Sequence, residues 1–307
     1  MKLKKHIWAF CFSAALIAFT TYIALDTFVI PRVYKANATE MNTSMFSNIP
    51  KTTLDNSQSS GSVKNTSSAD KSYRDENISI SLTEYYENNT KIYVADVTLS
   101  SAEYLKTAFA KDSYGKNITE TTSDMAEDKN AVFAVNGDYY GAQESGYVIR
   151  NGVVYRSTAK GADVLCVYTD GTLGIVSDSE YTADELVEKG VWQAFTFGPS
   201  LVEEGEVTVG VNDEVGKAMA SNPRTAIGMI DTNRFVFVVS DGRTSESSGL
   251  MSLYELAQFM QGLGVKTAYN LDGGGSSTMY FNGQVINNPT SGRGIKERGV
   301  SDIVYIG

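Results

Sequence analysis

The sequence predicts an α+β domain with a large central mixed β-sheet and a few packed helices, preceded by one N-terminal transmembrane helix. Three observations predict this class. A long uncharged apolar run lies near the N-terminus, stretches rich in β-branched and aromatic residues recur from about residue 73 onward, and two capped helical segments lie among them. The chain has 307 residues and no evident internal repeat.

The apolar run, Ile7–Leu25, contains no charged residue and is about as long as a helix that spans a bilayer. Three lysines between residues 2 and 5 precede it, so the positive-inside rule predicts a cytoplasmic N-terminus and an extracellular C-terminal part. A cleaved signal peptide is the alternative, with Ala-Asn-Ala at residues 36–38 as its cleavage site. We expect residues 1–30 to be the cytoplasmic tail and anchor of a single-pass cell-membrane protein.

The segment after the apolar run is expected to be a tether. Residues 36–72 are dominated by Ala, Asn, Thr, Ser and Lys, and they contain few large apolar side chains. Such a segment cannot bury enough surface to offset the entropy lost on ordering. We therefore expect a disordered tether over residues 31–72, followed by one globular domain over residues 73–307.

The residue inventory excludes several kinds of chemistry. The only histidine, His6, precedes the apolar run, so the exported domain has neither a histidine triad nor a histidine-ligated zinc ion. Cys11 and Cys166 cannot form a disulfide within the domain, which suits a Gram-positive bacterial surface, and Cys166 is expected in the core. A net charge of −10 argues against nucleic acid as a partner but permits a local basic site.

Eight stretches are predicted to be strands because they alternate in polarity or are rich in β-branched and aromatic residues. They are residues 78–82, 91–99, 131–136, 164–168, 225–230, 234–240, 267–271 and 302–306. One predicted helix, at residues 182–190, starts with a cap residue and ends at a glycine. In the other, Ser252 and Glu255 have the spacing of a capping box ahead of an apolar stripe, and Gly264 follows as the C-terminal cap.

The sequence Asp-Gly-Gly-Gly-Ser-Ser-Thr follows a predicted strand at residues 272–278. It is neither a P-loop nor a dinucleotide fingerprint. Glycines allow backbone amides to converge on an anion such as phosphate, and the three hydroxyl residues add donors. Asp272 would then be the reactive carboxylate. A glycine-rich turn with a capping aspartate is the alternative interpretation.

Other predicted strands also end in acidic, amide or arginine side chains, and ligands often bind where strands end. These residues are Asn136, Gly137, Asp138, Arg224, Asp241 and Arg243, with Glu297 and Arg298 near the C-terminus. Ordinary turns and surface ion pairs explain each of them singly. Together they predict a site assembled at one sheet edge, where arginine suits bidentate binding of a phosphate group.

A series of motifs runs in order across about residues 75–307. They are NGDYY (136–140), FGPSLVEEG (197–205), PRTAIG (223–228), SDGR (240–243), NLDGGGSSTM (270–279) and ERGVSD (297–302). In this combination the chain resembles the phosphodiester glycosidase family, which has many bacterial members linked to exopolysaccharide or cell-surface glycans. The resemblance implies cleavage of the bond between a sugar's anomeric carbon and a phosphodiester oxygen.

The implied reaction fits the available residues. Arginines, amides and hydroxyls stabilise a departing phosphate monoester, while a carboxylate meets the oxocarbenium-like carbon as nucleophile or as base for water. We therefore assign Asp272 as the main catalytic carboxylate and Asp241 or Asp138 as the second. The expected substrate-binding residues are Asn136, Gly137, Arg224, Arg243, Gly273, Gly274, Gly275, Ser276, Ser277, Thr278, Glu297 and Arg298. No cofactor is expected, although the carboxylates could hold Ca²⁺ or Mg²⁺.

The expected partner is a phosphosugar-containing surface or exported glycan, and membrane contact is expected through the N-terminal helix. Two alternatives to a hydrolase stay open. A non-catalytic module would bind an anionic cell-surface glycan through the same loop without turnover. A transferase acting in exopolysaccharide assembly would pass the sugar to an acceptor sugar rather than to water.

Overall fold

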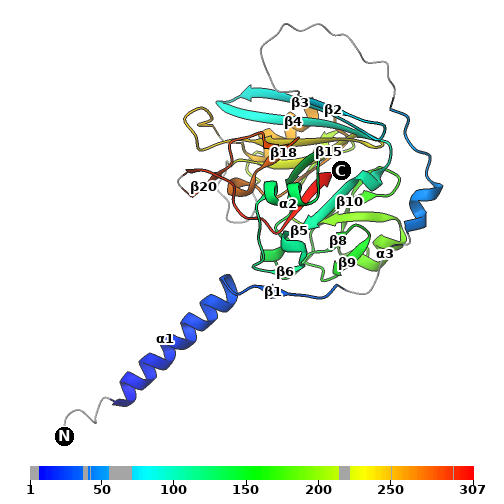
Figure 1. Cartoon of the computed structure of the whole chain (residues 1–307). Helices are drawn as coiled ribbons and strands as arrows, with labels where there is room; N and C mark the ends of the chain where they lie inside the picture. Colours follow the sequence, from blue (N-terminus) through cyan, green and yellow to red (C-terminus); the bar gives the residue numbers. More distant parts are fainter. Residues whose placement is uncertain are drawn as a thin grey trace.

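The computed structural model describes residues 7–36, 41, 43–54, 71–213, 222–249, 251–292 and 294–307. The lysine-rich flank of the apolar run, His6 and part of the 36–38 triplet lie outside these residues. The apolar run forms α1 (Ile7–Phe28), which has no buried residue and extends away from the domain (Figure 1). Its length and composition are sufficient to cross a membrane, as those of a signal sequence also are.

The first of three larger sheets has eight strands in the order β14-β13-β17-β15-β16-β4-β3-β2. They are β2 (Ser72–Arg74), β3 (Ile78–Glu87), β4 (Thr90–Leu99), β13 (Ser200–Glu203), β14 (Glu206–Val207), β15 (Thr225–Asp231), β16 (Arg234–Ser240) and β17 (Thr267–Asn270). The paired strands of this sheet are antiparallel.

The second sheet has the order β11-β10-β12-β8-β9 and the third the order β19-β18-β7-β22-β5. The second comprises β8 (Val148–Arg150), β9 (Val153–Arg156), β10 (Asp163–Tyr168), β11 (Leu173–Ser177) and β12 (Val191–Phe195). The third comprises β5 (Leu105–Phe109), β7 (Phe133–Asn136), β18 (Met279–Phe281), β19 (Gln284–Val285) and β22 (Asp302–Ile306). Two short pairs join β1 (Arg32–Val33) to β6 (Gly115–Lys116) and β20 (Thr290–Ser291) to β21 (Gly294–Ile295).

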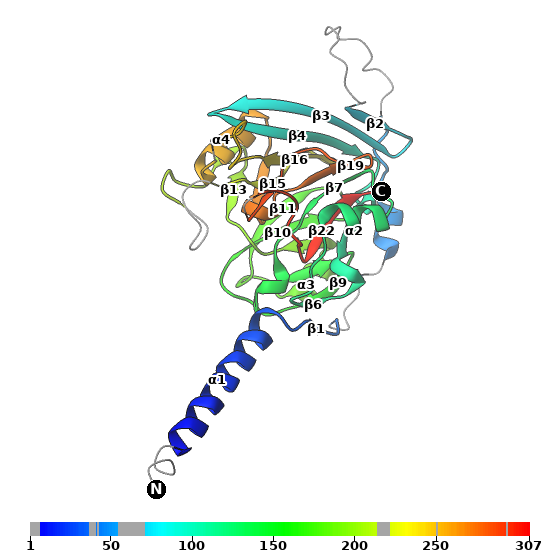
Figure 2. The same cartoon turned by 60° about the vertical axis from the view of Figure 1, so that its left-hand side comes forward.

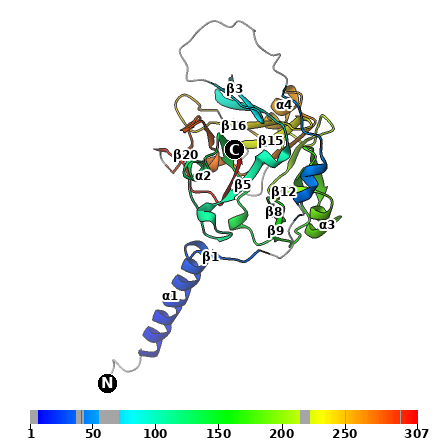
Figure 3. The ribbon, with the colours of Figure 1, turned by 45° about the vertical axis from the view of Figure 1, so that its right-hand side comes forward.

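Three short helices cover the sheets. They are α2 (Thr122–Asp128), α3 (Ala183–Glu188) and α4 (Leu253–Gly262). The predicted capping box of α4 is confirmed, because the Glu255 amide donates to Ser252 Oγ and the Ser252 amide donates to Glu255 Oε2, at 3.1 and 2.9 Å. The apolar stripe of α4 packs against the first sheet beside β13 (Figure 2), and α3 lies next to β9 and β12 of the second sheet (Figure 3).

The predicted α+β class is confirmed, and each of the eight predicted strands is present. The strands are shared among three sheets, which allows them to enclose one apolar core instead of twisting as a single very wide sheet. Phe133 of the third sheet and Phe237 of the first meet in that core, with ring centroids 5.0 Å apart. Cys166 is fully buried as expected, and burial raises the pKa of its thiol to about 12.

Part of the segment predicted to be a tether contacts the domain. β1 pairs with β6, Met41 is buried, and the ring of Phe46 lies edge-on to Trp192 with centroids 4.9 Å apart. Its polar composition predicted none of these contacts, because a few apolar residues among many polar ones give no periodic signal.

A buried ion-pair cluster links the second and third sheets. Arg150, at the end of β8, is 2 % exposed, and its guanidinium contacts the carboxylates of Asp138 and Asp302 at 2.8 Å each. It also lies over the Phe195 ring, 4.3 Å from the centroid. Burial and the neighbouring Asp138 carboxylate raise the pKa of Asp302, an effect that Arg150 opposes.

We expect Arg150→Met to lower the free energy of unfolding by about 3–5 kcal/mol, because it leaves two buried carboxylates without their cation. Urea denaturation followed by circular dichroism measures this loss. Arg234→Met is the control, since Arg234 pairs with Asp96 at a solvent-exposed position and should change stability by about 1 kcal/mol or less. Equal losses in the two variants would show that the buried ion pairs of Arg150 contribute no more to stability than an exposed ion pair does.

Candidate active site

The ends of β7, β15 and β17 meet where the first and third sheets adjoin, and one buried amide connects them. Asn136 Nδ2 donates to the Asp272 carbonyl oxygen at 2.6 Å, and Asn136 Oδ1 accepts from Thr225 Oγ1 at 2.8 Å and from the Thr278 amide at 3.3 Å. Asn136 is fully buried. We expected Asn136 to orient sugar or water; instead its hydrogen bonds to protein groups position the loop that carries Asp272.

Gly137 also holds the loop that carries Asp272, through its backbone. Its carbonyl oxygen accepts from the Asp272 amide at 3.2 Å, and its own amide donates to the Asp302 carbonyl at 2.9 Å. A Cβ at this position would lie 2.3 Å from Asp302 Oδ1, so close packing explains the glycine. Gly137 is therefore a packing residue here, rather than the binding residue we expected.

A cavity of about 330 Å³ opens in front of this junction. Its lining residues are Tyr139, Phe197, Asn222, Arg224, Arg243, Asn270, Leu271, Asp272, Gly273, Gly274, Gly275 and Arg298. The structure thus brings together the glycines, the three arginines and the principal carboxylate that the sequence predicted. The described lining contains three arginines and one aspartate, a formal charge of +2 in a protein of charge −10.

Asp272 is the only carboxylate among the described lining residues of this cavity. Arg298 Nη2 donates to its Oδ2 at 3.1 Å, and Arg298 Nε donates to Ser276 Oγ at 3.0 Å. Burial raises the pKa of Asp272, while hydrogen bonds from Ser276 and the charge of Arg298 partly offset the rise. The arrangement gives one poorly hydrated carboxylate held by a guanidinium.

The glycine-rich loop follows the chain of residues 222–224 closely. The Gly274 amide donates to the Pro223 carbonyl at 2.7 Å, and a Cβ on Gly273 would lie 2.8 Å from the same oxygen. Gly274 has a φ of +62°, in the left-handed region. Gly273 is therefore needed for the close approach to Pro223, and Gly274 for its left-handed backbone.

Three of the loop amides are already used in hydrogen bonds within the protein. The amides of Gly274, Ser276 and Ser277 donate to the carbonyls of Pro223, Gly273 and Gly274. The Ser276 hydroxyl serves Arg298, and the side chains of Ser277 and Thr278 are buried behind the loop and absent from the cavity lining. Positive charge in this cavity therefore comes from side chains.

The three arginines approach the cavity from different segments. Arg224 is 3 % exposed, and its Nε donates to the Met251 carbonyl at 2.9 Å. Arg243 is exposed, and its Nη2 donates to Asn222 Oδ1 at 2.6 Å. Arg298 lies over the ring of Tyr139, 5.9 Å from the centroid, and Tyr139 itself has a φ of +61°. A bulky residue in that backbone region is uncommon and often marks a functional position.

Asp241 and Asp138 do not reach the cavity. Asp241 Oδ1 accepts from the Asn288 amide at 2.9 Å and from Asn287 Nδ2 at 3.2 Å, and its Oδ2 accepts from Tyr93 Oη at 3.2 Å. Its carboxylate therefore fixes the loop after β19. Asp138 is held by Arg150, so neither aspartate lies where a second catalytic carboxylate was expected.

Glu297 is directed away from the cavity as well. Its Oε1 accepts from the Ser123 amide at 3.0 Å and its Oε2 accepts from the Ser123 hydroxyl. Both bonds are at the N-terminus of α2, where a carboxylate is favoured by the helix dipole. We expected a substrate-binding residue; the structure shows a helix-capping one.

Sequence reasoning missed several lining residues, including Tyr139, Phe197, Asn222 and Asn270. Asn270 is 1 % exposed; its Nδ2 donates to the Gly198 carbonyl at 2.8 Å, and its Oδ1 has no hydrogen-bond partner among the described residues. Each of the four lies in or directly beside one of the motifs described above. Position in a motif was therefore the one feature of the sequence that could have identified them as site residues. Nothing in the sequence showed which motif residues face the cavity.

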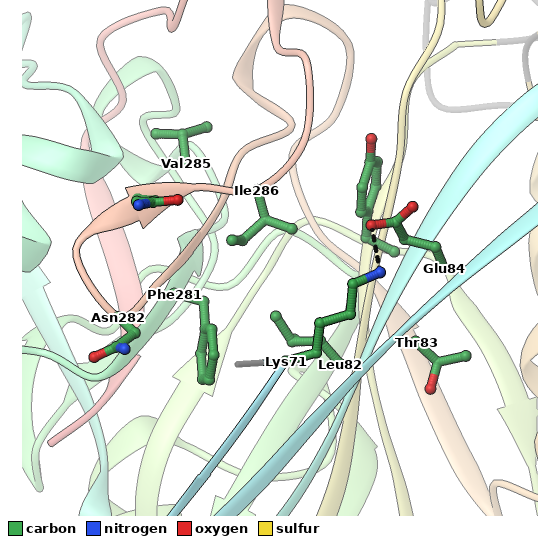
Figure 4. Close-up of a pocket in the computed structure, with 10 residues that line it drawn as sticks. Lys71, Leu82, Thr83, Glu84, Phe281, Asn282, Val285 and Ile286 are labelled. Carbon is green, nitrogen blue, oxygen red and sulfur yellow. Dashed lines mark hydrogen bonds and ion pairs between the residues drawn. The ribbon is translucent and has the colours of Figure 1, made fainter. Parts of the chain in front are cut away.

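Two further cavities among the described residues contain none of the predicted site residues. One of about 310 Å³ lies between β3 and the β18–β19 hairpin, with an ion pair of 3.0 Å between Lys71 and Glu84 at its edge (Figure 4). Another, of about 610 Å³, shares Phe197 with the candidate site and is lined by Asp163, Glu203 and Asp213 among others. Within the described residues, no group of three or more His, Cys, Asp or Glu side chains could hold a metal ion.

Residues 129–307, more than half of the chain, match the family described as phosphodiester glycosidase. The chain belongs to this family. A Bacillus subtilis (strain 168) SPbeta prophage-derived uncharacterized protein, YomE, is 31 % identical over 199 residues, covering 63 % of this chain and 30 % of YomE. Human N-acetylglucosamine-1-phosphodiester alpha-N-acetylglucosaminidase is 32 % identical over 132 residues, covering 39 % of this chain and 25 % of the human protein.

Solved structures show the same phosphodiester glycosidase fold. The catalytic domain of the zebrafish N-acetylglucosamine-1-phosphodiester alpha-N-acetylglucosaminidase, auto-inhibited by its pro-peptide, superposes with a TM-score of 0.59 at 19 % identity, covering 92 % of this chain and 98 % of that one. A hypothetical protein from Synechocystis superposes with a TM-score of 0.58 at 14 % identity, covering 75 % and 62 %. The matched segments are thus a minor part of the two sequence relatives but nearly all of the zebrafish domain.

We expect Arg298→Met to raise the pKa of Asp272 further, because it removes the charge and the hydrogen bond that oppose the effect of burial. An NMR titration of carboxyl-labelled aspartate measures the change without requiring activity. Arg243→Met is the matched control, since Arg243 lines the same cavity but bonds to Asn222. A pKa that is unchanged in Arg298→Met would show that this arginine does not control the carboxylate.

Proposed function

We propose that the protein is a membrane-anchored extracellular hydrolase that cleaves the glycosidic bond of a sugar-1-phosphodiester in a surface or exported glycan. The observation that carries this proposal is the placement of Asp272 in a cavity that also contains Arg224, Arg243 and Arg298. Membership of the phosphodiester glycosidase family supports it, and the name of the human relative specifies that type of bond in that protein.

The arginines would hold the phosphate group. A phosphodiester carries one negative charge, and the phosphate monoester released by glycosidic cleavage carries up to two. Guanidinium groups fixed in advance around that position stabilise the charge as it develops, which lowers the barrier without a separate proton donor. This assignment also explains why a strongly acidic protein concentrates positive charge in one cavity.

Asp272 would meet the anomeric carbon, as nucleophile or as the base that activates water. A glycosidase with a poor leaving group needs a second carboxyl group as acid, but a phosphate monoester leaves as a stable anion. One carboxylate is therefore sufficient for this reaction, which agrees with the absence of Asp138 and Asp241 from the described lining. The pKa of Asp272 is raised, so this carboxylate becomes protonated at a higher pH than an ordinary aspartate does. On acidification, activity should therefore be lost at a correspondingly higher pH.

The sugar would occupy the side of the cavity formed by Asn270, Phe197 and Tyr139. Asn270 Oδ1, which is buried and has no partner among the described residues, would accept a hydrogen bond from an ordered water beside the sugar. Phe197 and Tyr139 offer aromatic surface to the apolar face of a sugar ring. The adjoining cavity beyond Phe197, with its carboxylates and no described arginine or lysine in its lining, would suit an uncharged hydroxyl-rich continuation of the glycan.

We expect Asp272→Asn to reduce the release of sugar from glycosyl phosphodiesters by about a thousandfold or more, because the reacting carboxylate is lost. The full chain in detergent is incubated with nucleotide-sugars and methyl sugar-1-phosphodiesters, and products are identified by mass spectrometry. The control is Asp241→Asn, which removes a buried structural carboxylate outside the cavity and should stay within about tenfold of wild type for the folded fraction.

Full activity of Asp272→Asn would refute the assignment. Tight binding of the substrates by wild type without any product, measured by calorimetry, would favour the glycan-binding module instead. Appearance of the sugar on an added acceptor sugar, in preference to water, would identify a transferase.

A further inference from the structure

Residues 26–36, which we call the docked segment, join α1 to the domain through several directional contacts. β1 lies in this segment and pairs antiparallel with β6, with Arg32 opposite Lys116 and Val33 opposite Gly115. The Tyr34 amide donates to the Tyr114 carbonyl at 2.8 Å, and the two tyrosine rings lie edge to face with centroids 6.0 Å apart. The segment is thus an added strand of the domain at this point.

Asn117 connects the domain to the end of α1 itself. Its Nδ2 donates to the carbonyl oxygens of Thr27 and Ile30, at 3.1 Å each. The last carbonyls of a helix have no partner within the helix, so a side chain from elsewhere that satisfies them fixes the helix end in place. An ion pair between Asp26 and Arg32 further closes the turn between α1 and β1.

The contact with β1 places the strongest demand for a glycine at position 115, because the other close atom, Ile118 Cδ1 at 2.9 Å, is the end of a flexible side chain. A Cβ at Gly115 would lie 1.9 Å from the Arg32 carbonyl oxygen, although Gly115 is not in the left-handed region that favours glycine. The absence of a side chain is what allows β1 to approach β6. A glycine selected for docking is a sequence feature that a free tether would not need.

The docked segment is also linked to the wall of the candidate site. The ring of Tyr114 stacks on that of Tyr140, with centroids 5.2 Å apart, and the Gly115 amide donates to Tyr140 Oη at 3.4 Å. Tyr140 directly follows Tyr139, which lines the cavity. Docking of residues 26–36 therefore supports the short stretch that places Tyr139 opposite Arg298.

We propose that the docked segment keeps α1 joined to the domain as a permanent membrane anchor and holds the domain in one fixed orientation against the bilayer. Cleavage at residues 36–38, the alternative suggested by the sequence, would remove β1 and uncover Tyr114 and Gly115. The domain is contacted by residues 26–36, nearly all of which precede that cleavage site, and this favours retention of α1. The proposal requires α1 to lie in a membrane, and it is independent of the reaction that the domain catalyses.

Hydrogen exchange measured by mass spectrometry on the full chain in lipid nanodiscs tests the docking. In wild type, the peptide covering residues 31–36 should exchange slowly. In Gly115→Ala it should exchange at least about tenfold faster, because the added Cβ separates β1 from β6. Gly262→Ala is the matched control, since a Cβ there meets nothing within 4 Å, and its exchange over residues 31–36 should equal that of wild type.

Asn117→Gly provides a second variant in case Gly115→Ala fails to fold. It removes the bonds to Thr27 of α1 and to Ile30 just after it without adding backbone strain, since Asn117 has a φ of +57°. It too should accelerate exchange at residues 27–36 while peptides of β15 and β16 stay protected. The mass of the protein recovered from bacterial membranes should include residues 7–28. Rapid exchange of residues 31–36 in wild type, or a mature chain that begins after residue 38, would overturn the proposal.

Discussion

The candidate site depends on the buried amide of Asn136. Its one side chain satisfies the Asp272 carbonyl and the Thr278 amide, at the two ends of the glycine-rich loop, and the Thr225 hydroxyl at the start of β15. Each of these groups would otherwise be a polar atom buried without a partner, and each such loss costs about 1–3 kcal/mol. The amide therefore joins the third sheet to the first at the point where the glycine-rich loop with Asp272 leaves β17, and the cavity geometry follows from that junction.

Much of the fold could be predicted from local sequence patterns, because these patterns arise from burial and from helix capping within the segment itself. The runs that became β4, β15 and β16 are buried on both faces, and the capping box at Ser252 satisfies helix amides that have no other partner. Short strands such as β8, β12 and β13 were missed. Each has only three to five residues, which give too little periodicity to distinguish a strand from a turn.

The site was predictable to the extent that strand ends define it. Asp272, Arg224, Arg243 and Arg298 do converge, whereas Asp138 and Asp241 look the same in sequence and serve other purposes. The difference lies in partners that are distant in the sequence. Arg150 forms an ion pair with Asp138, and the Asn288 amide donates to Asp241. A motif shows that a carboxylate ends a strand, but only the folded arrangement shows whether its oxygens are already occupied. The same reason explains why the amides of Gly274, Ser276 and Ser277 donate to Pro223 and to the loop itself.

The three arginines around Asp272 have a consequence for the reaction cycle under the proposed function. The group they hold gains negative charge when the glycosidic bond breaks, so they bind the product phosphate more strongly than the intact diester. Bond cleavage is then accelerated, while release of the product phosphate is slowed. Arg243 and Arg298 are the solvent-exposed members of the set, so salt ions in solution would screen their attraction for the phosphate. Turnover in such an enzyme would be governed by the exit of the phosphate, and its rate would respond to ionic strength more than the bond-breaking step does.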